Sequence, residues 1–463
     1  MAATDTSEII VIGAGIIGIT AALALQKDGH RVRILDRKGV ATETSSGNAG
    51  AFAFTDIEPL ASPGIMRKAP GWLLDPLGPL SLPARYALTI APWMLHFWRA
   101  TRPDRYHAAV AAQASLMHHS RAALERLITR VSGEHMMRRE GQLQLYEGQA
   151  QFNASLRAWD LRRQHGVAFD LLDTPGAIAE IQPGLSPRFT HAGFTPDWIN
   201  TTDPARWCHH LIRHFADAGG VVQIAEVSAL RQDSEGVTLE TTTGPRRARQ
   251  VVLAAGAWSH HLARTLGDHI PLETERGYNT TFPADSIGLR THLTFANHGF
   301  VVSRIGAGLR VGGAVELGGL TLPPDYRRAE VLVRKAMAFL PGFRPESGTQ
   351  WMGFRPSMPD SLPVIARARK ADRVIYAFGH GHLGLTQSAG TAELVAALVA
   401  QRAPALPLTP FHAGRFMNAA PAAFETSTGT AHGLTEGRRD TAPAPPLIAQ
   451  DHPHPSNQHG RLQ

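Results

Sequence analysis

The sequence contains a single cysteine, Cys208, among its 463 residues. One thiol cannot close an internal disulfide, which fits a reducing compartment. No apolar run reaches the roughly 18 residues that a membrane-spanning helix needs. The polar start, MAATDTSE, leads directly into an apolar strand and lacks the pattern of a secretory signal. We therefore expect a cytoplasmic protein and leave open a peripheral contact with the inner membrane.

Dense runs of Lys and Arg are also missing, as are zinc-ligand spacings and the aromatic signature of RNA-binding domains. The formal net charge is +7, from 46 Lys and Arg against 39 Asp and Glu. Without a basic cluster, this excess is explained as well by anionic substrates or acidic lipid as by nucleic acid. We therefore expect no nucleic-acid partner.

The most informative region is the start of the chain. EIIVIGAGIIGITAALALQKDGHRVRILDR reads as an apolar strand at 9–12, a glycine turn, a helix that Gly29 ends, and a second strand at 31–35. Such a βαβ unit requires a parallel sheet covered by helices. The same kind of pattern returns at 203–227 and 249–259, whereas 265–350 alternates in the manner of an antiparallel sheet.

These patterns predict an α/β fold in two interleaved domains. A Rossmann-type domain with a parallel sheet would comprise 1–70, 195–264 and 351–416. An inserted α+β domain with an antiparallel sheet, which would hold a substrate, would comprise 71–194 and 265–350. The remainder, 417–463, is rich in Pro, Thr, His and Ala and poor in core-forming residues, so we predict that it is disordered.

The segment GAGIIG supplies Gly13, Gly15 and Gly18. In a dinucleotide-binding turn the first glycine permits a tight turn, the second lets a pyrophosphate approach, and the third lets the helix pack on the strand. The helix N-terminus then offers free N–H groups to the phosphates. Asp36 ends the second strand, where its carboxylate can accept from both ribose hydroxyls, and Arg37 follows it. Both NAD and FAD use this turn.

Two later segments bear on the choice between NAD and FAD. TETSSGNAGAF, at 42–52, combines small residues with hydroxyl and amide groups, which suits a backbone passing a flat ligand but also describes an ordinary polar loop. In GHGHLGLTQSAG, Gly379 and the glycines after it open a helix whose free N–H groups would stabilise a reduced flavin. The alternative is a structural turn with His380 and His382 at the surface.

VIGAGIIG, ETSSGNAG, GFRPSMPDSLPVI and GHGHLGLT occur in this order, and with them the chain resembles the D-amino-acid dehydrogenases of the FAD-dependent D-amino-acid oxidase superfamily over about 8–416. The resemblance implies that the GAGIIG glycines and Asp36 hold the FAD pyrophosphate and ribose. Related enzymes with a tethered flavin use a C-terminal cysteine, which is missing here, so non-covalent FAD is implied. The other candidate cofactor contacts are Arg37, next to Asp36, and the family-matching positions Ser45, Ser46, Asn48, Ala49, Gly50, Val227, Gly256, Gly381, His382, Leu383 and Gly384.

The segment WMGFRPSMPDSLPVIA places Arg355 between Phe354 and Pro356. A guanidinium binds a carboxylate through two parallel hydrogen bonds, and the neighbouring prolines stiffen the backbone that carries it. From these residues alone, a structural salt bridge and a substrate contact both remain open. The resemblance implies that Arg355 binds the substrate carboxylate. It also implies a substrate-side role for Tyr278, whose alternative is a packing aromatic.

The chemistry that the resemblance implies is oxidative deamination of a D-amino acid to a 2-oxo acid. Hydride would pass from Cα to flavin N5, and the electrons to a quinone or another non-oxygen acceptor. His380 is a candidate for assisting proton loss from the amine. Trp93, Phe97 and Trp98 suit either a membrane-surface contact or the core. The alternatives are a dehydrogenase or oxidase of a secondary amine such as D-proline, D-hydroxyproline or sarcosine, a non-catalytic FAD-binding subunit of a complex, and an NAD-dependent dehydrogenase.

Overall fold

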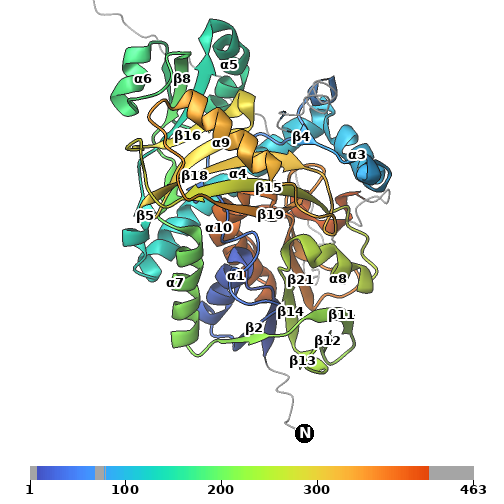
Figure 1. Cartoon of the computed structure of the whole chain (residues 1–463). Coiled ribbons are helices and arrows are strands. Elements are labelled where there is room, and N and C mark those ends of the chain that lie inside the picture. The colour runs from blue at the N-terminus through green and yellow to red at the C-terminus, as the bar shows by residue number, and fades with distance from the viewer. Residues whose placement is uncertain (1–7, 68–77, 79, 417–463) are drawn as a thin grey trace, which may run out of the picture. The chain divides into compact units, whose positions relative to one another are not determined.

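The parallel sheet expected from the βαβ unit is present in the computed structural model, which describes residues 8–67, 78 and 80–416 (Figure 1). Five parallel strands follow the order β10-β2-β1-β14-β21, and the antiparallel β20 forms the edge next to β21. The strands are β1 (Ile9–Ile12), β2 (Val32–Asp36), β10 (Val221–Ile224), β14 (Gln250–Leu253), β20 (Val364–Arg367) and β21 (Val374–Phe378).

Both faces of this sheet are covered, which is why its central strands are apolar at nearly every position. Ile9 and Val11 face a core shared with four helices. Ile10 and Ile12 face a second core, which α8 (Ser259–Thr265) and a small sheet cover. The four helices are α1 (Ile16–Lys27), α4 (Pro103–Arg130), α7 (Pro204–Asp217) and α10 (Gly384–Val399), and the small sheet is β11 (Val227–Gln232), β12 (Val237–Thr241) and β13 (Arg246–Ala248).

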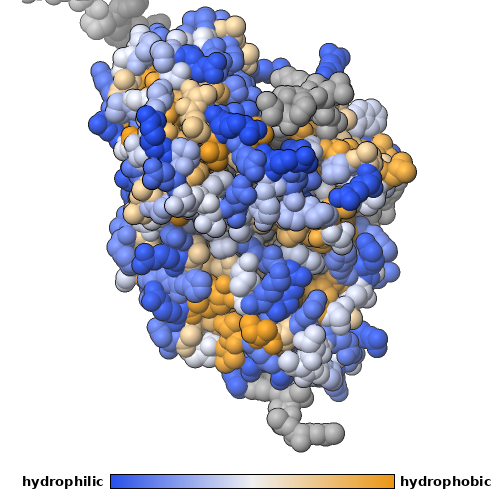
Figure 2. All heavy atoms as spheres, viewed as in Figure 1, coloured by the Kyte–Doolittle hydropathy of each residue, from blue (hydrophilic) through white to orange (hydrophobic). Residues whose placement is uncertain are grey.

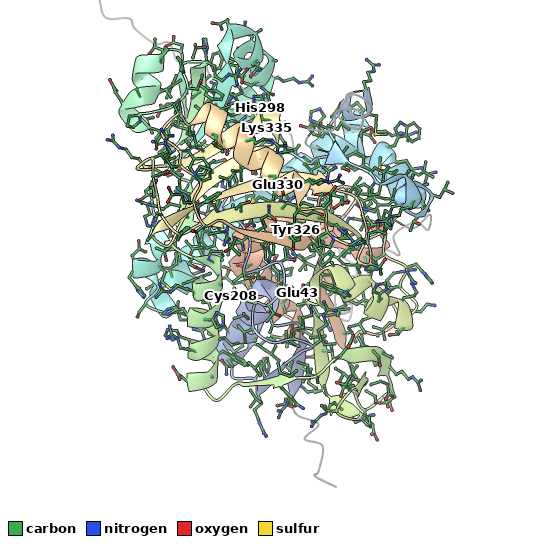
Figure 3. The ribbon with its side chains drawn as sticks, in the orientation of Figure 1. Glu43, Cys208, His298, Tyr326, Glu330 and Lys335 are labelled. Carbon is green, nitrogen blue, oxygen red and sulfur yellow. The ribbon has the colours of Figure 1, made fainter. Side chains whose placement is uncertain are left out.

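The helix α7 shows how local sequence sets an element. Asp203 caps it by accepting a hydrogen bond from the backbone N–H of Arg206, Pro204 occupies its first turn, and Gly219 with φ of 82° follows its end. Cys208 lies on its buried face, inside the core shared with α1 (Figure 3). Burial raises the pKa of this thiol to about 12.

The second large sheet is mostly antiparallel and follows the order β19-β15-β18-β17-β16-β6-β8-β7, with β4 paired to β18. The helix α9 (Arg327–Phe339) packs on one of its faces through Leu332, Ala336 and Phe339 (Figure 1). The strands are β4 (Leu80–Ser81), β6 (Gln142–Glu147), β7 (Asp170–Leu172), β8 (Phe189–Thr195), β15 (Glu273–Phe282), β16 (His292–Phe295), β17 (Phe300–Ile305), β18 (Gly308–Glu316) and β19 (Thr349–Ser357).

Period-2 alternation divides polar from apolar side chains on the two faces of this sheet. In β6, Leu143 and Leu145 belong to the core with α9, whereas Gln142 and Gln144 border a cavity on the opposite face. The strand β18 repeats the pattern, because Leu309 and Val311 pack in that core while Arg310 and Gly312 border the cavity. The sheet therefore presents its polar and glycine-rich face to the cavity.

The remaining elements connect or flank the two large sheets. A three-stranded sheet is formed by β3 (Ala51–Phe52), β9 (Ile199–Thr201) and β5 (Met137–Arg138). The other helices are α3 (Ala87–Ala100), α5 (Gly148–Gln164) and α6 (Pro175–Ile181). The predicted α/β fold is confirmed. The strands of the two sheets come from the two sets of predicted segments, except that β19 crosses the expected boundary at 351 and β8 ends one residue past the boundary at 194. The division into two domains stays a prediction, and the predicted tail lies outside the described residues.

The helix α3 carries an exposed apolar face (Figure 2, right-hand side). Leu88 is 90% exposed, Trp98 is 51% exposed and Leu95 is 46% exposed. Trp93, by contrast, is buried and stacks on Phe97, with ring centroids 5.2 Å apart. Within the described part of the chain, no helix has the length and apolar character needed to cross a bilayer.

Candidate active site

A cavity of about 820 Å³ is lined by residues from both large sheets. It is big enough for a cofactor and a small substrate together, since ligand pockets range over roughly 300–1,000 Å³. Most of the site residues predicted from the sequence line it: Gly13, Gly15, Asp36, Arg37, Ser45, Asn48, Ala49, Val227, Gly256, Tyr278, Arg355, His380, Gly381, His382 and Gly384.

Four predicted residues lie behind the cavity wall instead. A Cβ at Gly18 would come within 1.9 Å of the Gly13 carbonyl oxygen, so this glycine permits the close packing of α1 on β1. The Ser46 hydroxyl donates to the Glu43 carbonyl. Gly50 has φ of 72° and its N–H donates to the Asn48 side chain. Leu383 is buried in the core beneath α10.

The glycine turn after β1 brings the start of α1 to the cavity. Gly13 has φ of 110°, and a Cβ there would lie 2.3 Å from the Ala254 carbonyl oxygen, so only glycine fits. Gly15, Ile16 and Ile17 line the cavity, and the Ser45 hydroxyl accepts a hydrogen bond of 2.9 Å from the Ile16 N–H. The N-terminus of α1 therefore presents its positive end to a bound group, as a pyrophosphate requires.

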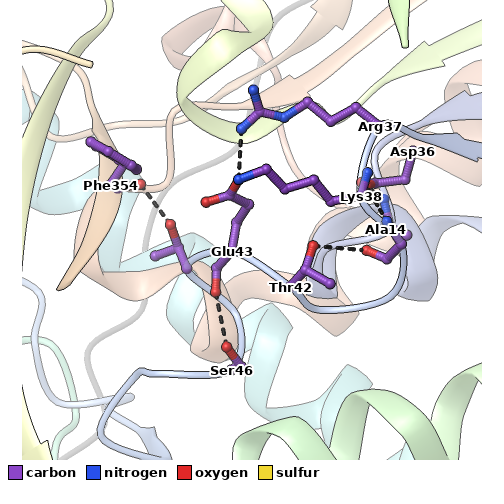
Figure 4. A network of polar contacts seen from close by, with 10 residues as sticks. Ala14, Asp36, Arg37, Lys38, Thr42, Glu43, Ser46 and Phe354 are labelled. Atoms are coloured by element: carbon purple, nitrogen blue, oxygen red, sulfur yellow. Dashed lines mark hydrogen bonds and ion pairs between the residues drawn. The ribbon is translucent and has the colours of Figure 1, made fainter. Parts of the chain in front are cut away.

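Asp36 organises the turn after β2 (Figure 4). Its Oδ2 accepts from the Ala14 N–H at 2.8 Å, and its Oδ1 accepts from the N–H groups of Lys38 and Gly39 at 2.8 Å. Because a carboxylate has about four acceptor sites, one remains for a ribose hydroxyl. The Arg37 side chain stacks on Trp258 at 3.7 Å from the ring centroid. These residues form the end of the cavity that suits an adenosine.

Arg37 is also paired with a carboxylate (Figure 4). Its Nη2 lies 2.6 Å from an oxygen of Glu43, which Lys38 approaches to 2.7 Å. The loop that contains Glu43 is tied to β19, since the Thr44 hydroxyl donates to the Phe354 carbonyl at 2.8 Å. The adenosine end and the strand that carries Arg355 are therefore connected through this loop.

The loop at 45–50 is held by residues that the sequence patterns did not single out. Arg310 on β18 donates to the carbonyls of Asn48 and Ser46, and Asn279 on β15 donates to the Gly47 carbonyl at 2.7 Å. Burial lowers the pKa of Arg310 to about 10, so the side chain remains charged at neutral pH. Arg310 stands alone in the apolar segment GLRVGG, the same signal that marked Arg355.

Arg355 lies on the edge strand β19 and lines the cavity. Its partner across the strand pair is Glu275, and the side chains of paired residues share a face. Its Nη1 donates to the Ala314 carbonyl at 3.0 Å, and no salt bridge to it occurs within the described residues. Burial lowers the pKa of Arg355, which Glu275 partly offsets. Arg355 therefore keeps hydrogen-bond donors for a group in the cavity.

Glu275 is a buried carboxyl that balances this charge without binding it directly. Its Oε1 accepts a hydrogen bond of 2.6 Å from the Ser357 hydroxyl. Burial raises its pKa, which Ser357 and Arg355 oppose. Arg355 is thus a cation whose balancing carboxylate, Glu275, already accepts a hydrogen bond from Ser357.

Tyr278 contributes to the cavity wall, but its hydroxyl bonds elsewhere. The hydroxyl donates to Glu316 and accepts from the Asp325 N–H at 3.0 Å. Burial, followed by Glu316, raises its pKa to about 12. Arg276, beside it, is fully buried and donates to the carbonyls of Gly319, Leu322 and Pro323. This geometry supports a role in holding the segment at 317–325.

The two histidines before α10 differ in their surroundings. The His380 ring is buried and its Nε2 lies 3.0 Å from the Thr391 hydroxyl in α10. Burial lowers its pKa to about 3, so it is a weak base directed at the helix. His382 borders the cavity, and burial together with Arg355 lowers its pKa to about 4. Both rings are neutral at neutral pH, and His382 lines the same cavity as Arg355.

The cavity has the features that a flavin dinucleotide requires. Its lining includes the starts of both α1 and α10, which can stabilise a pyrophosphate and a reduced ring respectively. Three described lining residues hold buried atoms without a protein partner, Nε1 of Trp198, Oδ1 of Asn279 and Nδ1 of His292. A Cβ at Gly47 would collide with the Trp351 ring, so glycine keeps this wall flat. The residues present therefore fit FAD. Cys208, the only cysteine, does not line the cavity.

Curated relatives cover nearly the whole chain. A D-amino-acid oxidase of Bradyrhizobium diazoefficiens is 33% identical, with 88% of this chain and 99% of the relative aligned. A D-amino acid dehydrogenase of Cereibacter sphaeroides is 34% identical, with 86% of this chain and 92% of the relative aligned. A D-amino acid dehydrogenase of Sinorhizobium medicae is 33% identical over 85% of this chain and 96% of its own.

Solved structures show the same fold at low sequence identity. Glycine oxidase from Geobacillus kaustophilus matches with a TM-score of 0.72 at 23% identity, over 89% of this chain and 99% of its own. L-proline dehydrogenase from P. horikoshii matches with a TM-score of 0.68 at 19% identity, over 89% and 98%. The family model described as "FAD dependent oxidoreductase" matches residues 8–398. The chain therefore belongs to the FAD-dependent oxidoreductases of the D-amino-acid oxidase family, as its motifs predicted.

Proposed function

We propose that this enzyme oxidises D-amino acids to 2-oxo acids, with Arg355 holding the substrate carboxylate. The observation that carries the proposal is the position of Arg355, a largely desolvated guanidinium in the wall of the cavity that also contains the dinucleotide-binding turn. A fork of two parallel hydrogen bonds would fix both the distance and the rotation of a carboxylate. The names of the curated relatives support an amino-acid substrate.

The protein's part in the reaction is to orient the substrate and to exclude water. When bound, FAD supplies the redox chemistry by accepting a hydride from the substrate Cα at its N5 atom. Arg355 would set the direction of Cα, and the Trp351 ring, which lies over Gly47 and Gly353, forms a flat part of the cavity wall. The imino acid that results is hydrolysed by water, which gives the 2-oxo acid and ammonia.

Proton transfer needs no strong base if the amine reaches the site unprotonated. His380 was the sequence candidate for assisting this step, but its ring nitrogen is bonded to Thr391 and its pKa is low. We therefore propose a structural role for His380, which anchors α10 to the strand region around Ser357. Tyr278 is likewise proposed to position the wall, since Glu316 and Asp325 occupy its hydroxyl.

A quinone or another non-oxygen carrier is the electron acceptor that we propose. The exposed face of α3, with Leu88, Leu95 and Trp98, supports contact with a membrane surface, where such carriers lie. Exposed Arg85 and Arg102 flank this face and favour an anionic bilayer. Reoxidation of the reduced enzyme by a water-soluble ubiquinone analogue, compared with air, tests the acceptor, and faster reoxidation by air would contradict it.

An anaerobic substrate panel tests the proposed function. Bleaching of the flavin absorbance by D-alanine, but not by L-alanine, would support D-amino-acid oxidation. Faster bleaching by cis-4-hydroxy-D-proline, D-proline or sarcosine would favour the alternative, a dehydrogenase or oxidase of secondary amines. A yellow protein that no amino or imino acid bleaches would instead indicate a non-catalytic FAD-binding subunit and would overturn the proposal.

A further inference from the structure

Asp56 is a carboxyl in the cavity wall that no motif singled out. It follows β3, in the segment that continues from the 45–50 loop. Its surface is partly accessible and borders the cavity, and no side chain or backbone group among the described residues donates a hydrogen bond to it. An ionised group enclosed by protein without a donor is costly, and it therefore marks a candidate for a ligand contact.

The backbone around Asp56 is tied to the start of α10 and to the turn after β19. The Ala53 N–H donates to the Thr386 hydroxyl in the first turn of α10 at 2.9 Å, and the Asp56 N–H donates to the Ala53 carbonyl at 3.1 Å. Further along, the Leu60 N–H donates to the Ser361 hydroxyl at 3.0 Å, in the turn after β19. The segment thus spans from the start of α10 to the strand that carries Arg355.

The charged groups around Asp56 are bonded to other residues, which leaves its carboxylate available for a ligand. Arg162 on α5 is the cation that acts on the charge of Asp56, but its Nη1 lies 3.3 Å from Glu58 and its Nε donates to the Thr55 carbonyl at 3.2 Å. Glu58 in turn accepts from the Tyr106 hydroxyl at 3.1 Å. Burial raises the pKa of Asp56 to about 6, which Arg162 opposes and Glu58 reinforces. At neutral pH the carboxyl is therefore mostly ionised.

Glu275, another carboxyl in the cavity wall, already has a hydrogen-bond donor. It accepts from Ser357 and lies opposite Arg355 in the strand pair. Asp36, Glu43 and Glu226 line the adenosine end instead. Among the described residues, Asp56 is therefore the cavity carboxylate outside the adenosine end that lacks a hydrogen-bond donor.

We propose that Asp56 binds the positively charged nitrogen of the substrate, opposite the carboxylate held by Arg355. This inference rests on the proposed function. An amino acid is a zwitterion, so a cation and a carboxylate that line one cavity match its two charges. The charged nitrogen belongs either to the α-ammonium group or to a basic side chain, and the chemistry that Asp56 recognises is the same for both.

The test compares the FAD-loaded full-length wild type with Asp56→Asn, which keeps the shape of the side chain and removes the charge. The substrates are D-norleucine, which carries only the α-nitrogen, and D-lysine, which adds a side-chain nitrogen to the same carbon skeleton. A loss in kcat/KM of about 10- to 100-fold is expected, since hydrogen bonds to charged groups contribute that much. An equal loss on both substrates identifies the α-ammonium, and a loss confined to D-lysine identifies the side chain.

Hexanoate, which has the D-norleucine skeleton without nitrogen, provides a binding readout through the flavin spectrum. Asp56→Asn should bind hexanoate as tightly as the wild type or more tightly, because a repelling charge is removed. Asp160→Asn, at an exposed site on α5, is the control and should change neither measurement. Retained kcat/KM on both amino acids, or a weakened affinity for hexanoate, would overturn the inference. A wild type that no amino or imino acid reduces would instead overturn the proposed function.

Discussion

Gly277 on β15 and Arg355 on β19 share one space: a Cβ at Gly277 would lie 2.3 Å from Nη2 of Arg355. The guanidinium therefore lies across the strand where a side chain is missing. At Gly353, which pairs with Gly277, a Cβ would instead lie 2.0 Å from the Trp351 ring. The position of Arg355 is set by the absence of a side chain on the adjacent strand as much as by its own flanking prolines.

Gly277→Ala should displace the guanidinium, because real Cβ contacts of this length do not occur and a long side chain is the part that can yield. We expect KM for the amino acid to rise by about tenfold or more while FAD binding is retained, since losing one charged hydrogen bond costs about 1.5–3 kcal/mol. Gly342→Ala, where the new Cβ would make an ordinary 3.7 Å contact, is the control. Steady-state kinetics on both variants decide this, and an unchanged KM in Gly277→Ala would contradict it.

Arg355→Ala should keep its yellow colour and lose saturable reduction by amino acids. Removing one member of a desolvated charge pair costs about 2–5 kcal/mol, so kcat/KM should fall by about 30-fold to several thousandfold. Arg355→Lys keeps the positive charge but cannot form two parallel hydrogen bonds, so its kcat/KM should lie between those of the wild type and Arg355→Ala. Anaerobic reduction at increasing substrate concentration measures the effect. Full saturation of Arg355→Ala at the wild-type concentration would contradict the carboxylate assignment.

Arg310→Gln should weaken the hold on the loop at 45–50, because the charged donor to Asn48 and Ser46 is lost. We expect the Kd for FAD to increase by about 10- to 100-fold, as expected for charged hydrogen bonds. Arg334→Gln, on the exposed side of α9, is the matched control. Titration of apoprotein with FAD, followed by flavin fluorescence, gives both values. An equal Kd in the two variants would show that the loop does not depend on Arg310.

The Tyr278→Phe variant tests whether Tyr278 supports the cavity wall or contacts the substrate. Removing the hydroxyl leaves Glu316 and the Asp325 N–H without this partner, which should lower the free energy of unfolding by about 1–3 kcal/mol. KM should change by less than about threefold, which is the size of the indirect effects that removal of a structural contact has. Denaturant unfolding and steady-state kinetics measure the two effects. A large rise in KM with unchanged stability would indicate that Tyr278 touches the substrate.

The raised pKa of Asp56 predicts a pH-dependent stability. Its native pKa of about 6 exceeds the value of 3.8 expected when it is unfolded, so the native state binds the proton more tightly. The contribution to stability is present below pH 3.8 and is lost as pH rises through about 6. Relative to Asp56→Asn, the wild type should lose about 1–2 kcal/mol between about pH 4.5 and pH 7.5. Urea unfolding of both proteins tests this, and parallel pH profiles would argue against a buried ionised carboxylate.

Sequence reasoning recovered the parallel sheet because its evidence is local. Ile9 to Ile12, the glycine turn and Asp36 lie within one βαβ unit, and each glycine serves a contact within that unit or with the next strand. The family was recoverable for the same reason, because its motifs are short and contiguous. Arg355 was singled out as a cation in apolar surroundings, and it lines the cavity, while its contact with a substrate stays a prediction.

Contacts between distant segments were beyond the reach of local patterns. Asn279 donates to Gly47, and Arg162 donates to the Thr55 carbonyl, across separations that no periodicity encodes. Tyr278 lies one residue from Gly277, yet strand alternation turns its hydroxyl toward Glu316. By itself, the sequence determined the fold class, the dinucleotide turn and the guanidinium, because these depend on neighbours along the chain. Only the tertiary structure decided which charges remain unpaired in the cavity, because pairing depends on which strands and helices are brought side by side.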